Sequence, residues 1–139
     1  MREVRILLAD DYEPWRQYVS SLLLKHPEWK IIGEVSDGIE AVRKCQELSP
    51  DVVLLDLNLP KINGVEAASH IRQSNPTTKI VFTTAYHDSD VMQTVLHNQA
   101  DGYVLKWEVT RDLIAAVETA LCGGKFVSKR LTDPPRVRL

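Results

Sequence analysis

The stretch "DVVLLD", residues 51–56, decides the fold, because four apolar residues follow one another between two aspartates. An unbroken run of this length, with two valines, is typical of a strand that is covered on both faces. The run "KIVFTT" (79–84) has the same character. Three further apolar runs of strand length are "VRILLA" (4–9), "KIIGEV" (30–35) and "DGYVLK" (101–106). The sequence therefore predicts five strands, two of them buried on both faces.

Between and after these runs, the apolar residues take the spacing of three and four that is typical of amphipathic helices. Alternating strands and helices indicate parallel strands joined by right-handed crossovers. We therefore expect an α/β fold of five β–α units, (βα)5, arranged as a three-layer sandwich. The five helical stripes are Trp15, Val19, Leu22 and Leu23; Ala41, Cys45 and Leu48; Val65, Ala68 and Ile71; Val91, Val95 and Leu96; and Leu113, Ala116, Val117 and Ala120.

Length and composition are those of one ordinary globular domain, with 139 residues, 44% hydrophobic residues and 26% charged residues. A net charge of −2 excludes a basic nucleic-acid-binding surface for the domain as a whole. No apolar run approaches the roughly 20 residues of a membrane helix, and the N-terminus "MREVRILLADD" does not have the form of a signal peptide. We therefore expect a cytoplasmic protein without membrane contact.

The C-terminal residues differ from the rest in charge and pattern. After Gly124, the stretch "KFVSKRLTDPPRVRL" fits neither the strand nor the helix period, and it has five basic residues against Asp133. Pro134 and Pro135 are typical of a linker. We therefore predict a folded domain over residues 1–124, with residues 125–139 as a basic tail or as the start of a linker to an output domain.

Polar residues follow four of the predicted strands at their carboxyl ends, where parallel sheets bind ligands. They are Asp10 and Asp11, then Asp56, then Thr83 and Thr84, and then Lys106. Each has a simpler alternative role: Asp11 as a helix N-cap, Asp56 as a turn residue, Thr84 as a strand-end residue and Lys106 as a solvated end. Together they favour a functional site, because complementary groups would converge on one edge of the sheet.

Three carboxylates within a few ångströms repel one another, and a divalent cation removes this conflict. A small set of oxygen ligands suits Mg²⁺, so Asp10, Asp11 and Asp56 are candidate metal ligands. Such a site can support attack by a carboxylate on a phosphoryl group, which forms an aspartyl phosphate. In that chemistry Lys106 would supply a second positive charge, and Thr84 a hydroxyl donor.

Four motifs stand out along the chain: "LLADD" (7–11), "VVLLDLNLPKINGVE" (52–66), "IVFTTAY" (80–86) and "ADGYVLKW" (100–107). Together they resemble the receiver domain of two-component response regulators, over Val4 to about Leu121. The resemblance implies a flavodoxin-like fold with a five-stranded parallel sheet of order 2-1-3-4-5, which is also the strand order of a chemotaxis receiver. "GYVLK" without a following proline, together with "GGKFVS", resembles the NarL/FixJ (LuxR-type) subfamily.

The resemblance also implies a role for each matching residue. Asp56 matches the phosphoacceptor, Lys106 the phosphate-binding lysine and Thr84 the switch hydroxyl. Tyr103 matches the aromatic residue that turns inward on activation. Mg²⁺ would be the cofactor, with four expected ligands: Asp10, Asp11, Asp56 and the backbone carbonyl of Asn58.

The function implied is that of a phosphoacceptor, which takes a phosphoryl group on Asp56 from a sensor histidine kinase. The receiver would catalyse only its own phosphorylation and dephosphorylation, form a phosphorylation-linked homodimer, and control transcription. DNA would be bound only through an output domain, for which the residues after Gly124 leave no room. The alternative is a stand-alone receiver or pseudo-receiver that acts as a protein-interaction module.

Two enzymatic or ligand-binding classes fit the pattern less well. A phosphatase with an aspartyl nucleophile would have D-x-D after the first strand, whereas Asp10 and Asp11 are adjacent. A nucleotide-binding domain would have a glycine-rich loop there instead of the acidic "DDYEP".

One residue departs from the receiver pattern, because Trp107 follows Lys106 where proline is usual. A cis bond before a non-proline residue costs roughly 2.5–4 kcal/mol, so we expect a trans peptide there.

Overall fold

The computed structural model of the chain describes residues 3–85, 90, 93 and 100–128. Six parallel strands form one sheet in the order β2-β1-β3-β4-β5-β6. The first five coincide with the five apolar runs, and their order is the predicted 2-1-3-4-5, so both predictions are confirmed. The strands are β1 (Val4–Ala9), β2 (Trp29–Val35), β3 (Val52–Asp56), β4 (Lys79–Thr84), β5 (Gly102–Leu105) and β6 (Phe126–Val127).

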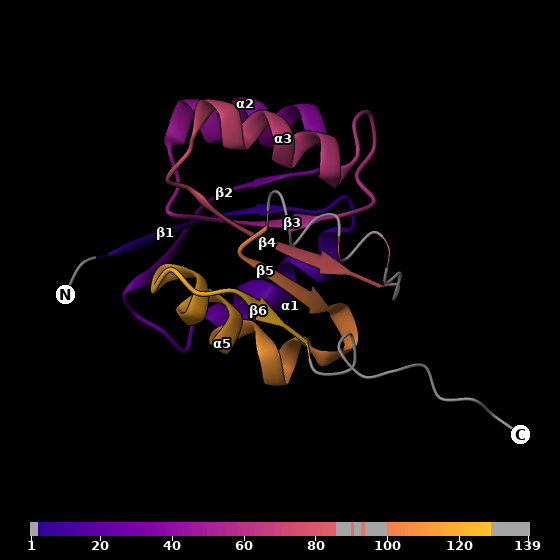
Figure 1. The fold of residues 1–139 in the computed structure, drawn as a ribbon. Helices are drawn as coiled ribbons and strands as arrows, with labels where there is room; N and C mark the ends of the chain where they lie inside the picture. The colour runs from indigo at the N-terminus through magenta and orange to yellow at the C-terminus, as the bar shows by residue number, and fades with distance from the viewer. Residues whose placement is uncertain (1–2, 86–89, 91–92, 94–99, 129–139) are drawn as a thin grey trace, which may run out of the picture.

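Helices cover both faces of the sheet and give the expected three layers. In Figure 1, α2 and α3 lie on one face, while α1 and α5 lie on the other. None of the helices in the described part of the chain is long and apolar enough to span a bilayer. The predicted helix around Val91 and Val95 lies outside the described residues. The helices are α1 (Glu13–Leu23), α2 (Gly38–Leu48), α3 (Gly64–Ser74) and α5 (Val109–Leu121), with a 3₁₀ turn η1 (Lys106–Glu108).

The sheet gains a sixth strand from residues that were predicted to form a tail. Phe126 and Val127 pair with Gly102 and Tyr103 of β5. The pattern did not reveal β6 because two residues are too few to show a period of two. The sheet thus continues past residue 124, and residues 129–139 lie outside the described part of the chain; the division into domain and tail stays a prediction.

Two layers of apolar side chains hold the sheet between its helices. Val53 and Leu55 of β3 face the core under α2 and α3, whereas Val52 and Leu54 face the core under α1 and α5. Each of these four side chains is at most 4% exposed. The unbroken apolar run of β3 is therefore buried on both faces, as predicted, and it fixes this strand in the middle of the sheet.

Candidate functional site

The carboxyl ends of the strands bring most of the predicted site residues to one edge of the sheet. Asp10 follows β1, Asp56 is the last residue of β3, and Thr84 is the last residue of β4. Lys106 follows β5 directly and begins η1. These residues are far apart in the chain, and the parallel topology brings them together.

Three carboxylates form a compact cluster at this edge. One oxygen from each of Asp10, Asp11 and Asp56 lies within 4.8 Å of the others. Asp10 and Asp56 are buried, at 2% and 4% exposure, whereas Asp11 is exposed. Asp11 therefore marks the side on which the cluster opens to solvent. The donor set consists of hard oxygens with excess negative charge, and this fits Mg²⁺.

Lys106 reaches into the cluster from the end of β5. Its Nζ lies 2.5 Å from Asp10 Oδ2 and 3.7 Å from Asp56 Oδ2. The same ammonium lies 4.9 Å from the centroid of the Trp15 ring, which is a cation–π distance. The sequence pattern assigned Trp15 only to the apolar stripe of the first helix, so its contact with Lys106 was not predicted. The described residues include no cis peptide bond, in agreement with the expectation for the bond before Trp107.

Burial and charge act in opposite directions on Asp56. Burial raises the pKa of the Asp56 carboxyl, the Lys106 ammonium opposes that rise, and the neighbouring Asp10 adds to it. The Asn58 backbone N–H lowers the pKa of Asp56, and Asp11 raises it. The net pKa lies above the usual value for aspartate. The site therefore lacks positive charge for the fully ionised cluster, which favours a bound cation.

The loop after β3 supports Asp56. The backbone N–H of Asn58 donates to Asp56 Oδ1 at 3.3 Å, and the N–H of Gly64 donates to the carbonyl oxygen of Leu57 at 2.8 Å. A Cβ on Gly64 would lie 2.2 Å from the Asp56 carbonyl oxygen, so only glycine fits there. The close approach places the start of α3 directly against the residue that carries the carboxylate.

Asp10 has supports that no sequence pattern predicted. Its Oδ1 accepts from the Tyr12 backbone N–H at 2.9 Å, and its carbonyl oxygen accepts from Arg16 Nη1 at 2.5 Å. Tyr12, not Asp11, is the N-cap of α1, so the alternative that Asp11 serves as a cap is wrong. Arg16 also pairs with Glu34 at 3.0 Å. The Tyr12 contact is a local turn of the kind that aspartate side chains form with the backbone two residues on, whereas the Arg16 contacts depend on how α1 leaves the end of β1.

The two predicted switch residues are both buried. Thr84 is 1% exposed and Tyr103 is 0% exposed. The Tyr103 ring lies beside Phe82, with centroids 6.3 Å apart at 47°. Tyr103 therefore already occupies an inward position in this structure. Its part in a switch, like that of Thr84, stays a prediction.

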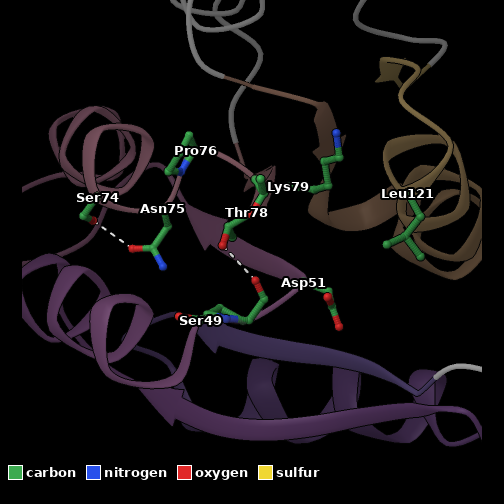
Figure 2. Close-up of a pocket in the computed structure, with 10 residues that line it drawn as sticks. Ser49, Asp51, Ser74, Asn75, Pro76, Thr78, Lys79 and Leu121 are labelled. Carbon is green, nitrogen blue, oxygen red and sulfur yellow. Dashed lines mark hydrogen bonds between the residues drawn. The ribbon is translucent and has the colours of Figure 1, made fainter.

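A hollow lies at the opposite end of the strands, between the ends of α2, α3 and α5 (Figure 2). Its polar groups largely bond to one another: Thr78 Oγ1 donates to the Pro50 carbonyl oxygen at 2.7 Å, and Ser74 Oγ donates to Asn75 Oδ1 at 2.8 Å (Figure 2). The carboxylate of Asp51 accepts from the Arg5 backbone N–H at 2.8 Å. These contacts hold loops together, so the carboxylate edge of the sheet is the stronger candidate for chemistry.

Comparison with known proteins places this geometry in a family. The family described as response regulator receiver domain matches residues 6–118. The nitrate/nitrite response regulator protein NarL of Escherichia coli strain K12 is 38% identical over 128 residues, which are 91% of this chain and 59% of NarL. The transcriptional regulatory protein DegU of Brevibacillus brevis is 33% identical over 130 residues, which are 94% of this chain and 55% of DegU. The chain thus spans little more than half the length of these relatives.

Solved structures agree with the sequence comparison. A LuxR-family two-component response regulator from an Aurantimonas species superimposes with a TM-score of 0.88 at 32% identity, covering 93% of this chain and 92% of that chain. The response regulator domain of Thermotoga maritima CheB superimposes with a TM-score of 0.80 at 26% identity, covering 87% of this chain and 98% of that chain. The sheet order, the clustered carboxylates and the family match agree: the chain belongs to the response regulator receiver domains and resembles those of the NarL type.

Proposed function

We propose that this receiver accepts a phosphoryl group on Asp56 from a phosphohistidine of a sensor kinase. The observation that carries the proposal is the position of the Asp56 carboxylate, 3.7 Å from the Lys106 ammonium and within 4.8 Å of two further carboxylates. A buried carboxylate next to a fixed cation is a suitable nucleophile for phosphorus. Receiver domains are signalling proteins, and the only catalysis proposed for this chain is the gain and loss of its own phosphoryl group.

In the proposed transfer, an Asp56 carboxylate oxygen attacks phosphorus, and the bond from phosphorus to the histidine nitrogen breaks. The electron pair of that bond returns to the imidazole nitrogen, which takes up a proton from solvent, so an aspartyl phosphate and a neutral histidine result. Lys106 holds positive charge against the incoming phosphoryl oxygens, because its ammonium lies between Asp10 and Asp56.

Mg²⁺ is the cofactor that the donor set fits. Asp10, Asp11, Asp56 and the backbone carbonyl of Asn58 are the proposed ligands. When bound, Mg²⁺ supplies positive charge that offsets the negative charge of the carboxylates and of the phosphoryl oxygens. Asp11 is the ligand best placed to meet the cation from solvent, since it is the exposed member of the cluster.

Thr84 and Tyr103 are proposed to convert phosphorylation into a change of shape. The Thr84 hydroxyl would donate to a phosphoryl oxygen on Asp56, and the space it leaves would favour the inward position of Tyr103. That position is compatible with the fold, since Tyr103 is fully buried here. A local charge change then biases an element with two arrangements.

The output is proposed to be transcription, exerted through a DNA-binding segment beyond the receiver domain. The relatives NarL and DegU are named as regulators, and this chain spans only 59% and 55% of their lengths. Phosphorylation of Asp56 is proposed to favour a homodimer, and the homodimer is proposed to be the form that binds DNA through the output segment.

The test is incubation with acetyl phosphate and Mg²⁺, followed by intact-mass spectrometry. The wild-type chain is expected to gain the mass of one phosphoryl group, and Asp56→Asn is expected to gain none. Asp51→Asn is the matched control, because Asp51 lies next to the same strand at its opposite end. It should be labelled like wild type, whereas chelation of Mg²⁺ should prevent labelling.

Labelling of Asp56→Asn at the wild-type rate would show that another residue is the acceptor. A folded wild-type chain that gains no phosphoryl group would instead favour the pseudo-receiver, a protein-interaction module. Size-exclusion chromatography with light scattering on the same samples tests the homodimer, whose mass should appear only after phosphorylation.

A further inference from the structure

Ser128 is the last described residue of the chain, and it lies ten residues beyond the end of the family match at residue 118. It directly follows β6, in the segment that was predicted to form a tail. Its exposure is nevertheless 0%. A fully buried polar residue at such a position needs hydrogen-bond partners, and these partners show what the residue does.

Three hydrogen bonds connect Ser128 to the rest of the fold. Its backbone N–H donates to the Tyr103 carbonyl oxygen at 3.0 Å. Its Oγ accepts from the Leu105 backbone N–H at 3.1 Å and donates to Asp112 Oδ2 at 2.9 Å. The hydroxyl therefore acts as acceptor and donor at once, joining the end of β5 to the first turn of α5.

The acceptor for Ser128 is itself held in place. Asp112 is buried at 6% exposure, and Arg111 Nε donates to its Oδ1 at 2.9 Å. Burial would raise the pKa of Asp112, but hydrogen bonds from Arg111 and from the Ser128 hydroxyl hold that pKa below its usual range. Asp112 is thus an ionised acceptor, which gives the Ser128 hydroxyl a fixed direction.

The residues that Ser128 holds are neighbours of the proposed reaction. Leu105 immediately precedes Lys106, whose ammonium lies 3.7 Å from Asp56 Oδ2. Tyr103 is the predicted switch aromatic. β6 ends at Val127, so the side chain of Ser128 provides the acceptor for Leu105 where a longer strand would provide a backbone carbonyl.

We propose that Ser128 is a positioning residue for the phosphoryl transfer: its hydroxyl bridges Leu105 and Asp112, and this bridge fixes the end of β5 that aims Lys106 at Asp56. The inference deepens the proposed function and rests on it. Under this proposal, a residue that follows β6 affects the phosphoryl transfer, because its hydrogen bonds hold the residue next to Lys106.

The test is a double-mutant cycle on the initial rate of labelling by acetyl phosphate at saturating Mg²⁺. Ser128→Ala should lower this rate roughly tenfold, since misplacing a reactive group by about 1 Å can cost 10²-fold. In a Lys106→Ala background the same substitution should have no further effect, because the group that it positions is gone. A serine with a purely structural role would slow both backgrounds equally or neither.

Thr78→Val is the matched control for a lost buried hydroxyl. Thr78 is 2% exposed, and its Oγ1 donates to the Pro50 carbonyl oxygen at the opposite end of the sheet. Its loss should lower the free energy of unfolding but leave the labelling rate unchanged.

Two results overturn the inference alone: a labelled, folded Ser128→Ala chain with the wild-type rate, or an equal slowing in both backgrounds. If circular dichroism shows that Ser128→Ala does not fold, Asp112→Ala takes its place in the same cycle, because it removes one end of the bridge. A wild-type chain that takes up no phosphoryl group overturns the proposed function, and this inference with it.

Discussion

At the scale of single residues, burial and like charges act on the pKa of Asp56 in one direction, and one nearby cation acts in the other. Asp56 is 4% exposed and lies beside Asp10 and Asp11, and both its burial and these neighbours raise its pKa. Lys106 opposes them, but it is shared with Asp10, whose Oδ2 is the nearer partner at 2.5 Å. A shared lysine leaves the cluster short of positive charge, which explains why the arrangement suits a divalent cation, whose charge would also offset that of an incoming phosphoryl group.

The opposing effects of Lys106 and Asp10 on the pKa of Asp56 predict opposite pKa changes when each residue is substituted. Lys106→Met should raise the pKa of Asp56 further, because it removes the charge that opposes burial. Asp10→Asn should lower the pKa of Asp56, because it removes a like charge and releases Lys106. Titration of the Asp56 carboxyl carbon by NMR without Mg²⁺ measures both changes. Shifts in the same direction would show that the charges do not control this carboxyl.

At the scale of elements, helix starts fix the loops around the site. Asp37 caps α2, and its side chain accepts from the Glu40 backbone N–H at 2.8 Å. The Gly38 N–H donates to the Pro60 carbonyl oxygen at 3.1 Å, and Lys61 pairs with Asp37 at 3.4 Å. The start of α2 therefore holds the loop that follows β3 and Asp56. The cap therefore acts on Asp56 only indirectly, through the contacts of Gly38 and Asp37 with Pro60 and Lys61 of that loop.

Asp37→Ala should lower the free energy of unfolding by about 1 kcal/mol at neutral pH, the usual cost of losing such a cap. The Glu40 N–H lowers the pKa of Asp37, burial opposes this, and Lys61 lowers it further. A depressed pKa gives stability that is complete above the unfolded pKa and is lost as pH falls through the folded pKa. The difference between wild type and Asp37→Ala should therefore narrow in acid.

Urea denaturation followed by circular dichroism, at neutral and at acidic pH, measures that difference. Asp37→Asn is the control, because asparagine caps a helix about as well as aspartate but does not titrate. It should stay close to wild type at neutral pH. A gap between wild type and Asp37→Ala that stays constant through the acid range would rule out the titration of Asp37 as its cause.

At the scale of the whole molecule, the strand order places the site. β1 lies between β2 and β3, so the connections that leave β1 and β3 run to opposite sides of the sheet, with α1 on one face and α3 on the other (Figure 1). In open parallel sheets, ligands bind at such a switch point, beyond the carboxyl ends of the strands. Asp10 follows β1 and Asp56 ends β3, the two strands on either side of this switch point, whereas Lys106 follows β5. A ligand held by all three joins distant parts of the chain.

Mg²⁺ should therefore stabilise the whole fold. A ligand that binds only the folded state at 100 times its Kd adds about 2.7 kcal/mol to the free energy of unfolding. Thermal or urea denaturation with and without MgCl₂ measures this gain, at ionic strength matched with NaCl. Asp11→Asn should lose most of the gain, since Asp11 is the exposed member of the proposed ligand set, and Asp51→Asn should keep it. An equal gain from NaCl alone would remove the metal-site assignment.

Much of the fold follows from local patterns, and the exceptions have physical causes. The five strands were predictable because each carries a short cluster of apolar residues of strand length, unbroken in β3 and interrupted by polar residues in β2. β6 was not, because its pairing with β5 depends on where α5 ends and on the turn at Gly123, whose φ is +85°. Trp15 was assigned only to the core, although its ring lies under Lys106. The contacts of Arg16 and Ser128 likewise join segments that no local period connects.

By itself, the sequence determined the alternation of strands and helices and the acidic, hydroxyl and amine groups at the strand ends, because hydrophobic periodicity and residue type are local properties. The tertiary structure decided which of these groups lie close together, at what distances and with what burial. In the folded chain, the Lys106 ammonium lies closer to Asp10 than to Asp56. Asp56 is buried, which raises its pKa, and Ser128 is fully buried. Distances, burial and shared partners arise only when separate segments pack together, and they set the charge balance on which the proposed chemistry depends.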